Sequence, residues 1–173
     1  LKLFPDLHLL TEISIDDIGT KHDTIRHASG SFERASKTIS ELKKLKKDHP
    51  NLSVGTICVF SKLNQDHFEE IYQHIRDVLQ PDSITVPLIR GNPKEHVKDI
   101  DIDKYKNITA WIKKDFLAKK LGFKFKYSKV SKATTIVMRD LIAETYKDNK
   151  NKITCQAGRI SAVIYPNGDV FPC

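Results

Sequence analysis

The sequence of 173 residues predicts an α/β fold in which parallel strands alternate with helices. Three observations predict this class. Three short runs rich in apolar and β-branched residues, 8–16, 52–60 and 83–89, have the composition of buried strands. The two segments between them carry apolar residues at steps of three and four, the spacing of an amphipathic helix. The connections are short, and this strand–helix order favours a parallel sheet with right-handed crossovers.

The first strand is expected to run into a long loop over residues 19–31. The next helix is expected to start after Ser31, a suitable N-cap, and to end before Pro50. Its buried face is expected to hold Phe32, Ala35, Ile39, Leu42 and Leu45.

The second strand contains Cys58, which is best explained as a small core side chain. Asn64 or Asp66 is a candidate cap for the following helix, which ends at Pro81 and buries Phe68, Ile71, Ile75 and Val78. The third strand contains Pro87, which lacks the N–H that a central strand needs. We therefore expect a bulge or a strand end at that position.

The remainder of the chain predicts two more helices and a hairpin. The helices are expected around residues 103–121, with Gly122 as C-cap, and around 132–148. Asn167-Gly168 between two apolar runs is a strong hairpin signal. As a two-residue turn it would place Ile164 opposite Phe171.

Composition narrows the classes of function. The net charge is +7, from 29 Lys and Arg against 22 Asp and Glu, which raises nucleic acid as a partner. The lysines at 43–47 and 113–120 lie at helical spacing among acidic and apolar residues, which is typical of solvated helix faces. No interleaving of aromatic and basic residues of the base-stacking kind occurs. The sequence therefore argues against nucleic-acid binding.

Neither a membrane span nor a disulfide framework is indicated. No run of about 18 apolar residues occurs. Three cysteines are too few and odd in number for a disulfide framework, and they fit a reducing compartment such as the cytoplasm, or a metal site. The sequence starts without Met and stops inside the expected hairpin, so we expect a segment of a longer protein.

The loops after the strands are the places where chemistry is expected, because functional groups gather at the carboxyl ends of parallel strands. Ser14, Asp16 and Arg26 lie in the first of these loops, together with Asp17, His22 and Asp23. A serine hydroxyl and an arginine fork are suited to bind a small carboxylate. The simpler alternative is a structural loop in which Arg26 pairs with Asp23. The loop at 90–92 is either a further contact to a ligand or an ordinary connection.

Cys155 and Cys173 are the second candidate site. Along an extended strand, Cys155 would lie roughly 23 Å from the position opposite Cys173. The two thiols can therefore share a site only if the chain doubles back near Gly158, and otherwise they are inert buried thiols. Two thiolates alone do not complete a four-ligand iron–sulfur site. His67 and His74 lie seven residues apart with no second pair of ligands, and we expect both at the surface.

Two motifs together resemble the radical S-adenosylmethionine (radical SAM) enzymes. Ser14-Ile15-Asp16, then His22-Asp23-x-x-Arg26 and Gly30-Ser31-Phe32, is similar to the fourth-strand motif of that family. Cys155-x12-Gly168-x4-Cys173 is similar to the opening of the SPASM extension of one subgroup. The chain departs from the usual pattern at Asp17 and His27, where the family commonly has glycine.

The resemblance implies the C-terminal half of a partial (β/α)6 barrel followed by a linking helix and a β-hairpin. Residues 1–127 would be strand–helix units four to six, 128–154 the bridging helix and linker, and 155–173 the start of the SPASM domain. The C-x3-C-x2-C ligands of the catalytic [4Fe–4S] cluster are absent here, so this segment alone is expected to be inactive.

The resemblance also implies a site and its partners. Ser14 and Arg26 would contact the ribose and carboxylate region of S-adenosylmethionine, with Asp16 ordering the loop. Cys155 and Cys173 would be the first two ligands of an auxiliary [4Fe–4S] cluster. The whole enzyme would abstract hydrogen from a substrate, with peptides and proteins among the candidates, and would draw electrons from a donor such as a flavodoxin or a ferredoxin. Two competing hypotheses remain: a non-catalytic basic module that binds phosphate or RNA, and an iron-free barrel enzyme with distant, buried cysteines.

Overall fold

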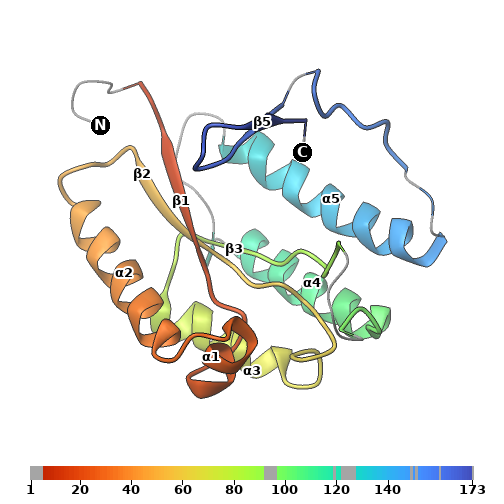
Figure 1. The fold of residues 1–173 in the computed structure, drawn as a ribbon, viewed down its shortest axis with the longest axis horizontal. Helices are drawn as coiled ribbons and strands as arrows, with labels where there is room; N and C mark the ends of the chain where they lie inside the picture. The colour runs from red at the N-terminus through yellow and green to blue at the C-terminus, as the bar shows by residue number, and fades with distance from the viewer. Residues whose placement is uncertain are drawn as a thin grey trace.

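A three-stranded parallel sheet forms the centre of the computed structural model (Figure 1), which describes residues 6–91, 97–118, 120–121, 128–148, 150, 152–159 and 161–172. The strand order is β1-β2-β3, with bounds β1 Leu9–Ser14, β2 Leu52–Ile57 and β3 Ser83–Thr85. Ser14 pairs with Ile57, and Ile57 pairs with Thr85, so the three carboxyl ends lie at one edge. The α/β class with a parallel sheet is confirmed.

Helices cover one face of the sheet. Their bounds are α1 Thr20–Arg26, α2 Ser31–Leu45, α3 Phe68–His74, η1 Ile75–Leu79, α4 Ile102–Leu117 and α5 Ser128–Asp148. One hydrophobic core joins the sheet to α2, α3, η1 and α4 through Val54, Ile39, Ile71, Ile75 and Ile112. Phe60 packs against the rings of Phe68 and Tyr105 at centroid distances of 5.0 and 5.5 Å. In the described part of the chain, no helix is long and apolar enough to cross a membrane.

The two faces of the sheet differ in polarity. Val54 and Ile84 are buried in the core, whereas Glu12 is exposed and accepts a hydrogen bond from Thr85 Oγ1 at 2.7 Å. Because side chains alternate along a strand, Ser14 lies on the same face as Glu12. This face, which we call the polar sheet face, also carries Gly55, where an added Cβ would lie 2.6 Å from Ser83 Oγ.

The segment expected to be a long loop contains a helix. Residues Thr20–Arg26 form α1, which begins after Gly19 (φ 58°) and ends at His27 in the left-handed region (φ 51°). The helix at 31–45 is confirmed, but Ser31 is not its cap. The Asp23 carboxylate instead accepts hydrogen bonds from the Gly30 N–H, the Ser31 hydroxyl and the Phe32 N–H. A residue eight positions upstream therefore caps α2, which local spacing does not reveal.

The helix after β2 begins later than expected. Its N-cap position is His67, and neither Asn64 nor Asp66 caps it. The helix continues as a π-helical turn, η1, and ends at Gln80 in the left-handed region. The expected core positions Phe68, Ile71 and Ile75 are buried, but Val78 is 63% exposed because the π-turn rotates it outward.

The strand end predicted at Pro87 is confirmed. Regular pairing of β3 stops at Thr85, and an isolated parallel bridge joins Phe60 to Leu88. The Phe60 N–H donates to the Pro87 carbonyl at 2.8 Å, so the proline contributes its acceptor and needs no N–H.

Helices α4 and α5 lie side by side beyond β3 (Figure 1). Asp101 caps α4 by accepting from the N–H groups of Asp103 and Lys104. Arg139 of α5 donates from Nη2 to the Ile84 carbonyl at 3.0 Å, which attaches α5 to the sheet. Both predicted helices are present, but α4 ends at Leu117 with Ala118 at its C-cap, so the expected end at 121 with Gly122 as C-cap is wrong, and α5 begins four residues before the expected 132. Gly122 itself lies outside the described residues.

The terminal hairpin is present with a register one residue from that predicted. β4 Val163–Ile164 pairs with β5 Val170–Phe171, and Ile164 faces Val170. The Tyr165 N–H donates to the Asp169 carbonyl, so the loop has three residues ending at Gly168 (φ 90°). Three-residue hairpin loops commonly end in such a glycine. The prediction of a two-residue turn centred on Asn167-Gly168 is therefore wrong.

Candidate functional site

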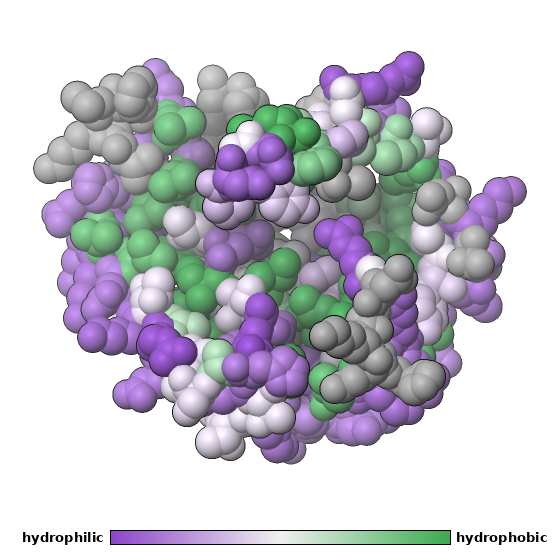
Figure 2. All heavy atoms as spheres, viewed as in Figure 1, coloured by the Kyte–Doolittle hydropathy of each residue, from purple (hydrophilic) through white to green (hydrophobic). Residues whose placement is uncertain are grey.

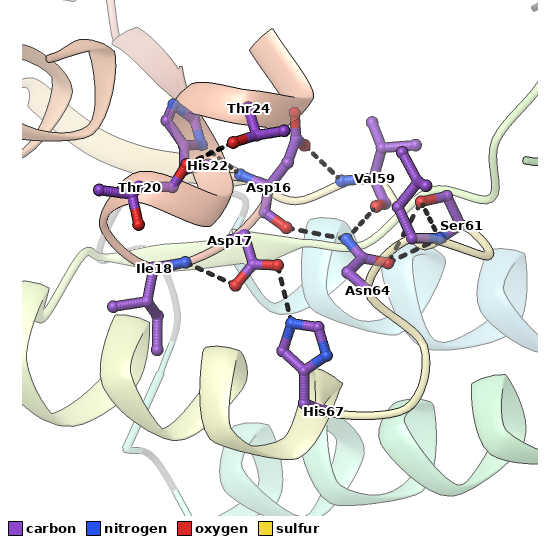
Figure 3. Close-up of polar contacts among 11 residues, drawn as sticks. Asp16, Asp17, Ile18, Thr20, His22, Thr24, Val59, Ser61, Asn64 and His67 are labelled. Atoms are coloured by element: carbon purple, nitrogen blue, oxygen red, sulfur yellow. Dashed lines mark hydrogen bonds and ion pairs between the residues drawn. The ribbon is translucent and has the colours of Figure 1, made fainter. Parts of the chain in front are cut away.

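Three of the polar residues predicted after β1, Asp16, Asp17 and His22, lie close to residues of the loop after β2 at the carboxyl edge of the sheet (Figure 3). Asp16 and Asp17 are buried, although both are acidic. Buried carboxylates are costly unless paired or hydrogen-bonded, so the question is which groups stabilise them.

Asp16 is held by an ion pair and a backbone hydrogen bond. Arg26 Nη2 lies 2.6 Å from Asp16 Oδ2, and the Val59 N–H donates to Asp16 Oδ1 at 3.0 Å. The side chain of Asp16 is 7% exposed and that of Arg26 is 38% exposed. Arg26 therefore pairs with Asp16 rather than with Asp23, which caps α2. This pair fixes the end of α1 to the loop after β2.

His22 supports the same loop from inside. Its Nδ1 accepts a hydrogen bond from the Asp16 N–H at 3.0 Å, and its ring packs edge-on against Phe32 at 5.9 Å. Burial lowers the pKa of His22, outweighing the nearby carboxylate of Asp16. A neutral ring with its proton on Nε2 agrees with an accepting Nδ1.

Asn64 connects the loops after β1 and β2. Its Nδ2 donates to the carbonyls of Asp16 at 2.8 Å and Val59 at 2.9 Å, and its Oδ1 accepts from the Ser61 N–H at 2.9 Å. Its side chain is fully buried. The sequence suggested a helix cap at this position, but the amide instead satisfies three backbone groups of two loops.

Asp17 pairs with His67, which sequence reasoning placed at the surface. Asp17 Oδ2 lies 2.7 Å from His67 Nε2, and Oδ1 accepts from the Ile18 N–H. His67 and His74 are both half-buried, so the surface expectation was wrong. Their burial follows from contacts between loops and helices that spacing within one helix does not show.

A cavity of about 350 Å³ lies beside this pair, and its lining residues include Asp17, His67, Lys21 and His27. Neither Ser14 nor Arg26 lines it. Ser14 is half-buried at the end of β1, on the polar sheet face. The predicted convergence of Ser14 and Arg26 on one ligand therefore stays a prediction. Both side chains retain partial exposure at the carboxyl edge of the sheet.

The cysteines differ sharply in environment. Cys58 is completely buried, as predicted, and burial raises the pKa of its thiol well above the ordinary value. Cys155 is exposed, which argues against the alternative of an inert, buried thiol at this position. Cys173 lies outside the described residues.

The chain makes a turn at Gly158, the position where the shared-site hypothesis expects it to double back, and the approach of the two thiols stays a prediction. Gly158 has φ 77° and donates its N–H to the Ser161 carbonyl, and an added Cβ there would lie 3.3 Å from Pro172. Among the described residues, no three histidine, cysteine or acidic side chains are grouped to hold a metal ion. Cys155 is thus the one exposed thiol in the described part, which by itself does not make an iron–sulfur site.

No protein-family model and no curated protein sequence matches this chain. Solved structures do share its fold. The structure of native anSMEcpe with bound AdoMet and the Kp18Cys peptide matches with a TM-score of 0.51 and 17% identity, over 99% of this chain and 46% of that one. Hexahistidine-tagged anSMEcpe with bound AdoMet matches with a TM-score of 0.51 and 16% identity, over the same shares. The name denotes an anaerobic sulfatase-maturating enzyme, a radical SAM protein. The chain therefore spans about half the length of these structures and has the fold of that part.

Proposed function

We propose that this chain is the C-terminal part of a radical SAM barrel followed by the start of a SPASM extension. The observation that carries the proposal is the structural match over 99% of the chain to an AdoMet-bound enzyme, together with the Ser14, Asp16 and Arg26 motif at the carboxyl edge. Residues 1–127 would be barrel units four to six, 128–154 the bridging helix and linker, and 155–173 the first SPASM segment.

The edge strand supports the barrel assignment. β1 is at one edge of the sheet, and Leu9 and Leu10 are 42% and 40% exposed on it. Figure 2 shows apolar residues exposed among hydrophilic ones on this side of the molecule. An apolar strand edge with unpaired backbone groups is costly in water. In a radical SAM barrel, further parallel strands would pair with β1 and cover it.

In the proposed site, the residues of this chain bind and orient the cofactor. S-adenosylmethionine, bound here and reduced by a catalytic [4Fe–4S] cluster whose ligands lie outside this sequence, would supply radical chemistry for hydrogen abstraction from a substrate. The Ser14 hydroxyl would donate to or accept from the ribose, and the Arg26 guanidinium would bind the methionine carboxylate. Asp16 would hold Arg26 in position through its ion pair and keep the loop closed against β2.

The cysteine pair is proposed as part of an auxiliary cluster site. Cys155 is exposed, and Gly158, three residues after it, lies close to Pro172, the residue before Cys173. These two thiolates would contribute two ligands, and further ligands would come from outside this sequence. A cytoplasmic location, a reducing partner such as a flavodoxin or ferredoxin, and a peptide or protein substrate belong to the same proposal. Native anSMEcpe binds cysteine-containing peptides of the kind its structures name, Kp18Cys and Cp18Cys.

The alternative of a non-catalytic basic module that binds phosphate or RNA receives no support from the lysines of α2. It required lysines gathered on one free face, but Lys43 of α2 donates to the Leu79 carbonyl and Lys46 pairs with Asp82. The iron-free barrel alternative required buried cysteines, whereas Cys155 is exposed.

The test uses the full-length protein, purified anaerobically with iron and sulfide restored. We expect a brown protein that forms 5′-deoxyadenosine from S-adenosylmethionine under reduction. Arg26→Gln and Ser14→Ala should bind the cofactor at least tenfold more weakly, since each removes a hydrogen-bond partner of a charged or polar ligand group. Arg34→Gln is the matched control, because Arg34 is an exposed arginine of α2 whose Nη1 donates to the Ser29 carbonyl. A full-length protein without an iron–sulfur chromophore, or without 5′-deoxyadenosine formation, would refute the proposal.

A further inference from the structure

Arg139 is a buried arginine, and one nitrogen of its guanidinium group has no hydrogen-bond partner in the part of the chain that the structure describes. Its relative exposure is 5%, and its Nη2 donates to the Ile84 carbonyl. Its Nη1 is buried without a hydrogen-bond partner among the described residues. The guanidinium carbon lies 5.2 Å from the centroid of the Phe116 ring, so one face of the group is against an aromatic surface.

The charge of Arg139 is only weakly compensated among the described residues: the Asp140 carboxylate acts on it from beyond ion-pair distance. In the described part of the chain, no carboxylate forms an ion pair with it. Burial lowers the pKa of Arg139, the sign of a cation taken from water without an adequate counter-charge. Buried charges in proteins are normally paired, because desolvation otherwise costs several kcal/mol per ion. An anion close to Arg139 would remove this imbalance.

A cavity suited to an anion lies beside it. The cavity has a volume of about 480 Å³ and lies between α4 and α5, with Arg139 among its lining residues. Three lysines line it as well: Lys106 and Lys113 from α4 and Lys147 from α5. Asp140 and Glu144 are the acidic residues of the lining, so four cationic groups and two carboxylates line the cavity. Lys106 Nζ also lies 3.5 Å from Asp103 Oδ1, in an exposed ion pair.

We propose that this cavity binds a small organic phosphate, with Arg139 and the lysines holding the phosphate group. Lysine and arginine are the side chains that proteins use for phosphate oxygens. The volume exceeds that of a bare phosphate, and hydroxyl or amino groups of the remainder of the ligand would face Asp140 and Glu144. Four cations that line one cavity of about 480 Å³ suit a small ligand, whereas nucleic acid is bound by a basic surface that extends over several phosphates. The site lies between helices and not at the carboxyl edge, so the proposal does not depend on the radical SAM assignment.

The test is direct binding to the full-length protein. Ribose 5-phosphate and inorganic phosphate are titrated at constant ionic strength, with chloride as the reference salt, by calorimetry and by the shift in unfolding temperature. We expect both phosphates to bind and raise the unfolding temperature, with ribose 5-phosphate binding more tightly. Lys106→Gln/Lys113→Gln should weaken binding about tenfold, since it removes two phosphate partners at exposed positions. Lys37→Gln, at a 76% exposed lysine of α2, should leave binding unchanged.

Arg139→Met separates a ligand role from a structural one. If Arg139 serves the ligand, this variant loses phosphate binding at least tenfold, while its unfolding midpoint without phosphate stays close to that of the parent protein. A lower midpoint with unchanged phosphate binding would show that the residue only attaches α5 to β3, and would overturn the proposal. Equal stabilisation by chloride, equal binding by the double lysine variant, or binding of single-stranded RNA without binding of either small phosphate would overturn it too.

Discussion

Asn64→Ala should destabilise the fold more than any change at an exposed position, because the Asn64 amide satisfies three backbone groups at once. Nδ2 donates to the Asp16 and Val59 carbonyls, and Oδ1 accepts from the Ser61 N–H, at distances of 2.8 to 2.9 Å. The side chain is fully buried, so water does not replace it freely.

The magnitude follows from counting the groups left without a partner. Leaving one buried polar group unsatisfied costs about 1–3 kcal/mol. Alanine removes the partner of three such groups, and the loops lie at the edge of the sheet, where water can reach part of the site after truncation. Taking the lower bound for each group gives a loss of about 3 kcal/mol in the free energy of unfolding.

Urea unfolding followed by circular dichroism measures this loss. Asn107→Ala is the matched control, since Asn107 is exposed on α4, and its effect should stay within about 0.5 kcal/mol. Asn64→Asp keeps the acceptor for Ser61 but places an oxygen against two carbonyls, so it should be at least as destabilising as alanine at neutral pH. If Asn64→Ala lost less than about 1 kcal/mol, or if Asn64→Asp left the free energy of unfolding unchanged, the Asn64 amide would not be what stabilises the contact between the two loops.

Three further outcomes are expected. Burial lowers the pKa of His22, so as the pH falls the unfolded chain binds a proton at this residue before the folded protein does. The contribution of His22 to the free energy of unfolding should be fully present above pH 6.5 and should decrease below that pH. In urea unfolding from about pH 8 to about pH 5, His22→Gln should make the free energy of unfolding depend less on pH. Burial raises the pKa of Cys58, so mass-spectrometric mapping of thiol alkylation should show rapid modification of Cys155 and none of Cys58 until urea unfolds the chain. Tyr72→Phe should cost about 1–2 kcal/mol in the same unfolding assay, because it removes the 2.7 Å hydrogen bond from the phenol to the buried Asp115 carboxylate; an unchanged midpoint would contradict it.

Much of the fold could be predicted because it follows from periodicity. The three parallel strands, the helices at 31–45 and 102–117 and the strand end at Pro87 all rest on local apolar patterns or on the missing N–H of proline. Few arrangements of these strands and helices bury all of their apolar residues, so the α/β class could be predicted. The buried state of Cys58 came from the same logic.

The failures share a different cause. α1 was expected to be loop because its seven residues carry a weak pattern, and its helix is held by Asp16 and Asp23 contacts to other segments. The one-residue register error in the hairpin arose because Asn167-Gly168 fits both a two-residue turn and a three-residue loop. In each case the competing conformations are close in local energy, and contacts at longer range select one.

The sequence was sufficient to predict the fold class and the edge of the sheet where polar groups gather. These predictions followed from apolar spacing, from turn residues and from the motif between Ser14 and Arg26. Only the tertiary structure shows the partners of those groups. Arg26 pairs with Asp16, Asp17 pairs with His67, Asn64 connects two loops, and Arg139 lines a cavity that lysines also line. The physical reason is that secondary structure depends on neighbours a few residues away, whereas burial of a charge is stabilised by whichever distant group the topology brings within about 3 Å.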